Sequence, residues 1–138
     1  MGSSLKLPPK MELHLVRILS LSRYGYHFMA VSFIHGWMLS LMQAYLGRPD
    51  DKLEFRQWVD AVESDRLGFR GKAEILRRLR RLDALVERAS SAHDYEEANR
   101  IMKPHVRPSG VLYRRVFHSM FDISRLDSPK GGPEDCTA

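Results

Sequence analysis

Five arginines in one short segment are the residues whose type and spacing point most directly to a binding chemistry. They are Arg70, Arg77, Arg78, Arg81 and Arg88. In a helix that turns by about 100° per residue, all of them except Arg78 fall within one narrow stripe about 27 Å long, which Arg78 and Arg80 flank. The planar guanidinium group binds phosphate oxygens with two hydrogen bonds. The spacing therefore predicts a helix that lies on nucleic acid and contacts mainly its backbone.

Acidic residues in the same segment support a second interpretation. They are Glu74, Asp83 and Glu87. Three of the arginines lie about one turn from Glu74, at a spacing that allows ion pairs along a helix: Arg70, Arg77 and Arg78. A charged run is commonly a solvated helix face. In this interpretation local ion pairs satisfy the arginines, and the segment binds no nucleic acid.

Other features of the chain refine the nucleic-acid hypothesis. No aromatic residue is interleaved with these arginines. That absence disfavours stacking on the bases of single strands and favours recognition of a duplex by its backbone or shape. Further basic residues would enlarge the surface if they lie alongside, in loops or on the last helix: Lys103, His105, Arg107, Arg114 and Arg115.

Arg100 and His105 are separated by four residues, one of which is Pro104. The spacing resembles the RxxxxH signature of HEPN-domain RNases. These are helical bundles in which the arginine and the histidine cleave RNA in a composite site across a dimer. The resemblance covers six residues of the chain. It implies an alternative function, RNA cleavage by Arg100 and His105.

The sequence predicts no metal site and no cofactor. His93 and Glu97 are one turn apart, but no second pair completes a set of ligands. The chain lacks the motifs of zinc proteases, serine hydrolases and dinucleotide-binding or phosphate-binding loops. The lone cysteine, Cys136, has no fixed base nearby in sequence to activate it. These observations favour a protein that is not an enzyme.

The elements that position these residues are predicted to be helices. Apolar residues at three-and-four spacing and the placement of proline and glycine predict helices over 10–22, 26–46, 51–64, 70–89, from about 91–94 to 102, and 111–125. Asp50 is the expected N-cap of the third helix, and Gly47 the expected C-cap of the second. No segment alternates apolar and polar residues as a half-buried strand does. We expect an all-α, compact bundle of about five or six helices around a central apolar helix.

The expected central helix lies in a segment without charged side chains, between Arg23 and Arg48. Its length is sufficient to span a bilayer. Polar side chains such as His35 and Gln43 are costly against lipid tails, whereas a helix wrapped by other helices accommodates them. The composition favours a buried core helix over a membrane span.

The whole-chain properties limit the range of partners. The chain has 138 residues and a formal net charge of +5. This length fits one helical domain over 10–125, between a flexible N-terminal segment over 1–9 and a disordered tail over 126–138. The positive charge favours an anionic partner, either nucleic acid or an acidic protein. A single cysteine is compatible with a reducing compartment, and we expect a cytoplasmic protein.

Three functions compete at this point. The leading hypothesis is a small, non-enzymatic protein that binds nucleic acid or regulates another process. It would be a dimer, because apolar residues occur nearly all round the first two predicted helices. The second hypothesis is a protein-interaction module, such as an adaptor, an immunity protein or a subunit of a larger assembly. The third is the HEPN-like RNase.

Overall fold

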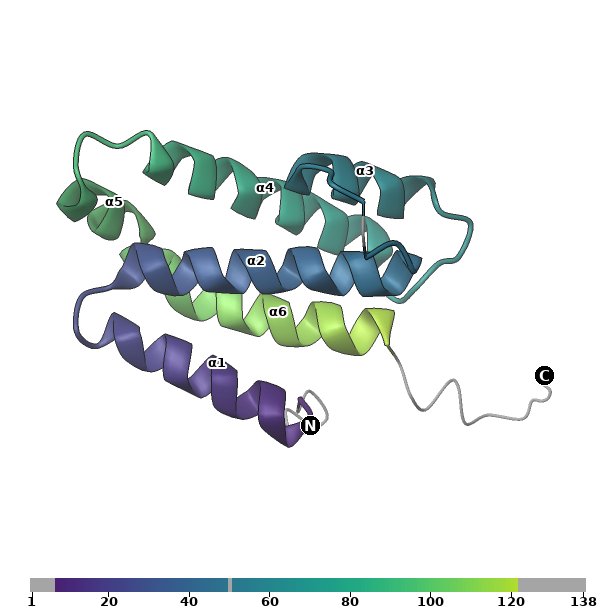
Figure 1. Ribbon diagram of the computed structural model, residues 1–138, viewed down its shortest axis with the longest axis horizontal. Helices are drawn as coiled ribbons and strands as arrows, with labels where there is room; N and C mark the ends of the chain where they lie inside the picture. The colour runs from purple at the N-terminus through teal and green to yellow at the C-terminus, as the bar shows by residue number, and fades with distance from the viewer. Residues whose placement is uncertain (1–6, 50, 122–138) are drawn as a thin grey trace.

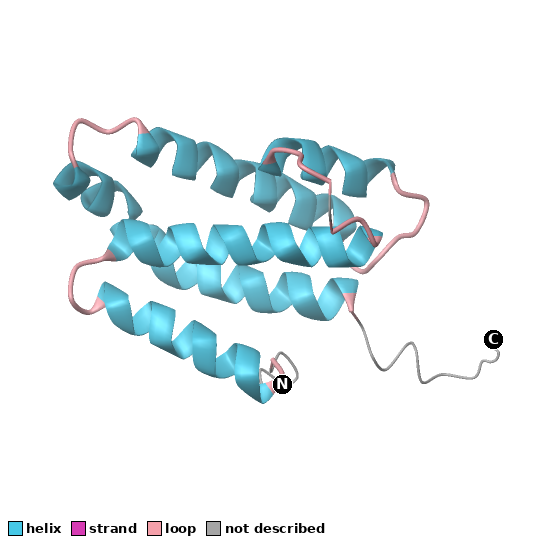
Figure 2. Ribbon diagram, in the orientation of Figure 1, coloured by secondary structure: helices cyan, strands magenta, loops and turns pink. Residues whose placement is uncertain are grey.

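The computed structural model describes residues 7–49 and 51–121 and contains six α-helices (Figure 1). Their bounds are α1 Pro9–Ser22, α2 His27–Leu46, α3 Phe55–Ser64, α4 Lys72–Ser90, α5 Tyr95–Met102 and α6 Val106–Met120, with a 3-10 turn, η2, over Lys103–His105. The described residues include no strand (Figure 2). The predicted all-α bundle is confirmed.

The apolar helix α2 lies at the centre of the bundle. It contacts every other α-helix: α1 on one side, α3, α4 and α5 on the other, and α6 behind it (Figure 1). Its inward face buries Ala30, Val31, Ile34, Met38, Leu41 and Met42. The predicted central helix is therefore confirmed. None of the helices in the described part of the chain is both long enough and apolar enough to cross a membrane.

The two ends of α2 are capped in different ways. At the C-terminal end, Gly47 adopts the left-handed conformation with φ of 67°, which fits its predicted role as the C-cap. At the N-terminal end, Tyr26 provides no side-chain cap. Instead the backbone N–H of Phe28 donates to Oδ1 of Asn99 on α5, at 2.9 Å. The start of the central helix thus depends on a residue 71 positions further along the chain.

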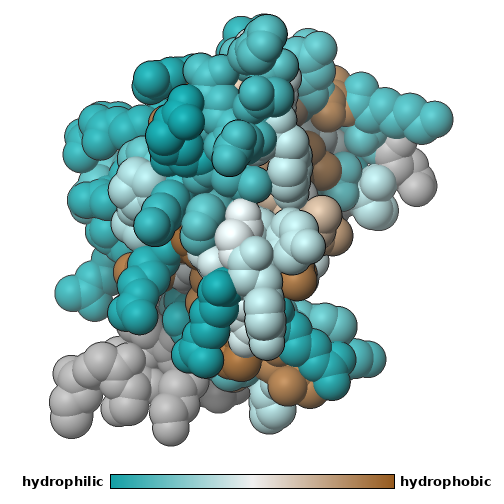
Figure 3. All heavy atoms as spheres, turned by 90° about the vertical axis from the view of Figure 1, so that its left-hand side faces the viewer, coloured by the Kyte–Doolittle hydropathy of each residue, from teal (hydrophilic) through white to brown (hydrophobic). Residues whose placement is uncertain are grey.

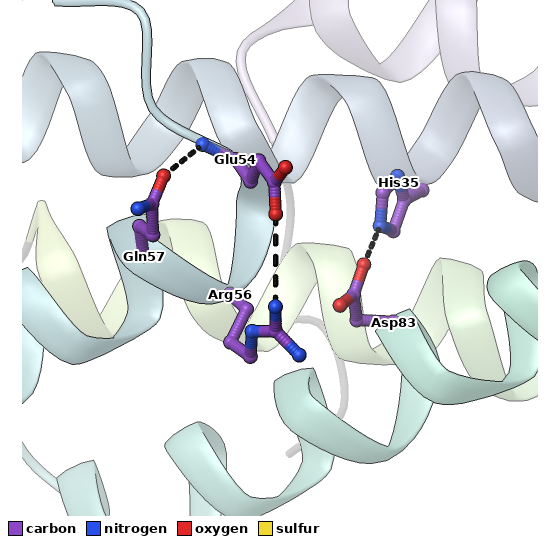
Figure 4. Close-up of polar contacts among 5 residues, drawn as sticks. All are labelled: His35, Glu54, Arg56, Gln57 and Asp83. Carbon is purple, nitrogen blue, oxygen red and sulfur yellow. Dashed lines mark hydrogen bonds and ion pairs between the residues drawn. The ribbon is translucent and has the colours of Figure 1, made fainter.

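Helix α3 begins later than the sequence predicts. The expected start is Asp51 with Asp50 as N-cap, but the helix begins at Phe55. Glu54 and Gln57 form a capping box there, in which the backbone N–H of Glu54 donates to Oε1 of Gln57 at 2.8 Å (Figure 4). The reciprocal bonds satisfy two amide groups of the first turn, so this site outcompetes the earlier aspartates.

Helix α5 begins close to the predicted start, whereas helix α6 begins earlier than predicted. Asp94, the last residue of the segment over 91–94 in which this helix was expected to begin, is the N-cap of α5, and its side chain accepts from the backbone N–H of Glu97. Helix α6 begins at Val106, five residues before the predicted start. Pro108 does not break α6, because an amide in the first helical turn has no intrahelical acceptor. The predicted end of this helix near Arg125 and the expected tail over 126–138 lie outside the described residues.

Two glycines lie in different backbone conformations, and replacing each with alanine should change the stability of the protein in opposite directions. Gly71 precedes α4 with φ of 73°, and a Cβ there would lie 3.1 Å from Nη2 of Arg115. Gly110 lies inside α6, where a Cβ would meet Leu19 at an ordinary 3.5 Å. We predict that Gly71→Ala lowers the free energy of unfolding by about 1–2 kcal/mol. Gly110→Ala should raise it by up to about 1 kcal/mol.

Urea denaturation followed by circular dichroism measures both changes. Equal shifts of the two denaturation midpoints would contradict the prediction that an added Cβ is strained at Gly71 and tolerated at Gly110.

Candidate nucleic-acid interface

Helix α4 separates its apolar and arginine faces. Its buried side chains are Ile75, Leu76, Leu79, Leu82 and Ala89. Arg77, Arg81 and Arg88 are exposed on the opposite side, because helical geometry places all three within a narrow sector. They span about 16 Å along the helix axis at about 1.5 Å per residue. We call these three residues the arginine stripe.

Arg80 anchors one edge of α4 to α3. Its guanidinium group donates to Asp60 at 2.9 Å and to Glu63 at 2.7 Å. These hydrogen bonds, with Asp60 contributing most, raise the pKa of Arg80. A residue that flanks the predicted stripe therefore holds two helices together.

Asp83 anchors α4 to α2. Its carboxylate lies 2.9 Å from Nε2 of His35, as the close-up in Figure 4 shows. The His35 ring also stacks on Phe55 of α3, with ring centroids 4.0 Å apart and an interplanar angle of 16°. One histidine on the central helix thus contacts both α3 and α4. Because Asp83 is directed at His35, its charge is not placed on the arginine stripe.

Glu74 anchors α4 to α6. Its Oε1 accepts from Arg115 at 2.8 Å, and its Oε2 accepts from Arg78, one turn further along α4, at 3.1 Å. The hydrogen bond from Arg115, followed by that from Arg78, lowers the pKa of the Glu74 carboxyl to about 2. Glu74 is consequently ionised at neutral pH and engaged on both oxygens.

The arginine stripe has no such anchor. Among the described residues, none makes a side-chain hydrogen bond or ion pair with Arg77, Arg81 or Arg88. Of the other predicted site residues, Arg78 pairs with Glu74. Arg70 is exposed and has no ion-pair partner in the same part of the chain, but it lies before α4, separated from it by Gly71. Local acidic residues therefore satisfy one of the five predicted arginines.

The residues expected to extend this surface fall into two groups. Lys103 and Arg107 are exposed. Arg114 reaches Glu12 on α1, with Nε 3.3 Å from Oε1, and Arg115 reaches Glu74. The last two side chains tie α6 to its neighbours. The sequence pattern did not reveal these roles, because their partners are distant in sequence.

Arg100 and His105 do not share one continuous α-helix. Arg100 lies exposed in the last turn of α5, whereas His105 is half-buried at the end of the 3-10 turn that contains Pro104. His93 and Glu97 meet through the backbone, because Oε1 of Glu97 accepts from the N–H of His93 at 3.0 Å. Within residues 7–49 and 51–121, no three histidine, cysteine or acidic side chains are grouped to hold a metal ion.

Comparisons with known proteins do not identify the class of protein to which the chain belongs. No family model matches the chain, and no curated protein and no solved structure is significantly similar to it. The fold and the site together define a small all-α bundle whose helix α4 presents three arginines that have no ion-pair partner among the described residues.

The position of Glu74 predicts an acid-dependent loss of stability. Its pKa is about 2 in the folded protein and near 4.5 without its partners, so its stabilising effect is complete above the higher value. That effect disappears as the pH falls toward the lower value. We expect Glu74→Gln to lower the melting temperature at pH 7, and we expect the difference from the native protein to shrink between about pH 4.5 and 2.

Glu87→Gln is the matched control, because Glu87 is exposed on the same helix and has no ion-pair partner within the described chain. Thermal melts of the three proteins across this pH range make the comparison. A Glu87→Gln variant that behaves like Glu74→Gln would show that charge alone, and not the contacts of Glu74, is responsible.

Proposed function

We propose that the protein is a non-enzymatic, duplex-binding protein that contacts the nucleic-acid backbone through the arginine stripe of α4. One observation carries the proposal: Arg77, Arg81 and Arg88 are exposed and unpaired within the described residues, although their neighbours Arg78 and Arg80 are engaged. A ligand phosphate would meet these three guanidinium groups without displacing a carboxylate.

The electrostatics of the chain support this proposal. The net charge of +5 attracts polyanions at long range, and cations placed against phosphates release condensed counterions. Arginine suits the contact, because its planar fork binds phosphate with two hydrogen bonds and is less strongly hydrated than lysine. A row of arginines on one helix is therefore a suitable binding face for a phosphate backbone.

The geometry of α4 favours a duplex over a single strand. The stripe, about 16 Å long, exceeds the width of about 12 Å of the major groove of B-form DNA, so its ends reach phosphates on both strands. Helix α4 contains no aromatic side chain on which an unpaired base could stack. Three residues of α4 make polar contacts with neighbouring helices, so the helix that presents the arginines is tied to the bundle on several sides.

Removing two of the stripe arginines tests the proposal. The double variant Arg77→Ala with Arg81→Ala should weaken binding to any duplex about ten- to a hundredfold, because two charge-assisted contacts are lost. It should also lower the slope of log affinity against log salt by about 1.8 for B-form DNA. Fluorescence anisotropy titrations of labelled DNA and RNA duplexes between about 50 and 200 mM salt measure both quantities.

The matched control is Arg17→Ala with Arg23→Ala, which removes the same charge from exposed arginines near α1. The control should retain most of the affinity. Equal losses of duplex affinity in the two double variants would mean that net charge alone accounts for the binding. Unchanged affinity in the stripe variant would refute the proposal.

The same RNA samples distinguish binding from cleavage. We predict that labelled RNA stays intact during incubation with the native protein, as judged on a denaturing gel. Cleavage that disappears in an Arg100→Ala with His105→Ala variant would instead establish the HEPN-like alternative. The absence of duplex binding at physiological salt, together with capture of an acidic protein, would favour the interaction-module alternative.

A further inference from the structure

The central helix α2 has an outer face that no other described helix covers. Met29 and Phe33 are 39% and 48% exposed there. Three small or apolar positions continue the face toward the C-terminal end of the helix, and all are exposed: Gly36, Ser40 and Ala44. We call these five residues the outer face of α2. In Figure 3, which views the end of the bundle that carries α5 and the start of α2, apolar surface emerges between hydrophilic regions.

This face differs chemically from the rest of the surface. Helix α2 contains no Asp, Glu, Lys or Arg, although 28% of the residues in the chain are charged. An open apolar pocket of about 330 Å³ begins on this face, where Met29 and Phe33 line it together with Phe28, Ser32 and Tyr95. An uncharged, partly hollowed surface of this kind is typical of a contact site.

The order of large and small side chains makes the outer face complementary to itself. Phe33 and Ser40 are equally far from the midpoint between Gly36 and Trp37, and so are Met29 and Ala44. When two copies of α2 pack antiparallel about that midpoint, Phe33 of one copy meets the partner's Ser40, and Met29 meets the partner's Ala44. Each large side chain then lies opposite a small one.

The middle of the face allows a close approach of two helices. A Cβ built on Gly36 would meet no atom within 4 Å, so the backbone is open to solvent at this point. Helices whose contact residues are small approach to about 8 Å between axes. Trp37, on the adjacent edge, is held by His14 and Tyr113, with ring centroids 6.2 and 5.5 Å away. In the antiparallel register centred between Gly36 and Trp37, this large side chain lies opposite the partner's Gly36, so here too a large residue meets a small one.

From these observations we propose that the protein forms a symmetric dimer through antiparallel packing of the outer faces of α2. A second copy fits this surface better than an anionic partner, because the surface carries no cation to recognise one. An uncharged contact also suits two molecules that each carry a net charge of +5, since it places no like charges opposite each other at its centre. The arginine stripe belongs to α4, so this proposal does not depend on duplex binding.

The two proposals respond to salt in opposite directions. Salt screens the repulsion between two positively charged copies and strengthens apolar burial, so dimerisation should be unchanged or tighter at high salt. Duplex binding should weaken under the same conditions. Failure of one proposal is therefore distinguishable from failure of the other.

A size exchange across the predicted contact tests the dimer and its register. Phe33→Ser leaves a void opposite the partner's Ser40, and Ser40→Phe places two phenylalanines opposite each other. We expect each single variant to raise the dissociation constant of the dimer about tenfold or more, as a well-packed contact position does. The double variant, Phe33→Ser with Ser40→Phe, restores a large side chain opposite a small one and should return the constant to within about threefold of the native value.

Sedimentation equilibrium of the full chain in reducing buffer, without nucleic acid, measures the dissociation constants. The control is Leu13→Ser, which removes an equally exposed apolar side chain, 49% exposed, from α1. The control should leave the dimer unchanged. Circular dichroism verifies that every variant is folded, which we expect because all the changed side chains are partly exposed.

Three outcomes would overturn the proposal. The first is a native protein that stays monomeric at all accessible concentrations, even if an apolar dye binds in the pocket. The second is a dimer that both single variants leave intact, since the contact would then lie elsewhere. The third is a double variant no tighter than the single variants, which would refute the antiparallel register.

Discussion

The rotation of α4 about its own axis determines what the protein presents to solvent. Apolar residues alone leave this angle loosely defined, because a stripe of leucine and isoleucine packs over a range of orientations. Three polar contacts restrict the rotation angle of α4, because Glu74, Arg80 and Asp83 contact α6, α3 and α2 respectively. Partly exposed ion pairs of this kind contribute little stability individually. Their value here is geometric, because together they direct the remaining arginines away from the bundle.

Two surfaces of the molecule differ in their chemistry. The arginine stripe offers charge without apolar area, and the outer face of α2 offers apolar area without charge. Helix α2 fills the interior with one side, while no other helix in the described part of the chain covers the side that carries Met29 and Phe33. Because the two surfaces lie on different helices, a change to one leaves the chemistry of the other intact.

Local sequence rules predicted most of the fold and part of the site. The proline at the start of α1 and Gly47 at the end of α2 set helix ends, as expected from their backbone preferences. The start of α3 was mispredicted because two capping signals compete within a few residues, and the structure uses the one at Glu54. Helical spacing predicted that Arg77, Arg81 and Arg88 share one face of α4, but it wrongly included Arg70, which precedes the helix. It did not predict that Glu74 pairs with Arg115, because that partner is 41 residues away.

The hydrogen bond from the Phe28 backbone to Asn99 has a consequence for the order in which the molecule forms. The chain leaves the ribosome from its N-terminus, so the apolar helix α2 is made well before α5 and α6. Until residue 99 emerges, the first turn of α2 lacks its cap, and the surface that α6 later covers is exposed. A nascent chain of this protein therefore passes through a stage in which its most apolar segment is unprotected. Chaperones that bind apolar segments would find their best substrate at that stage.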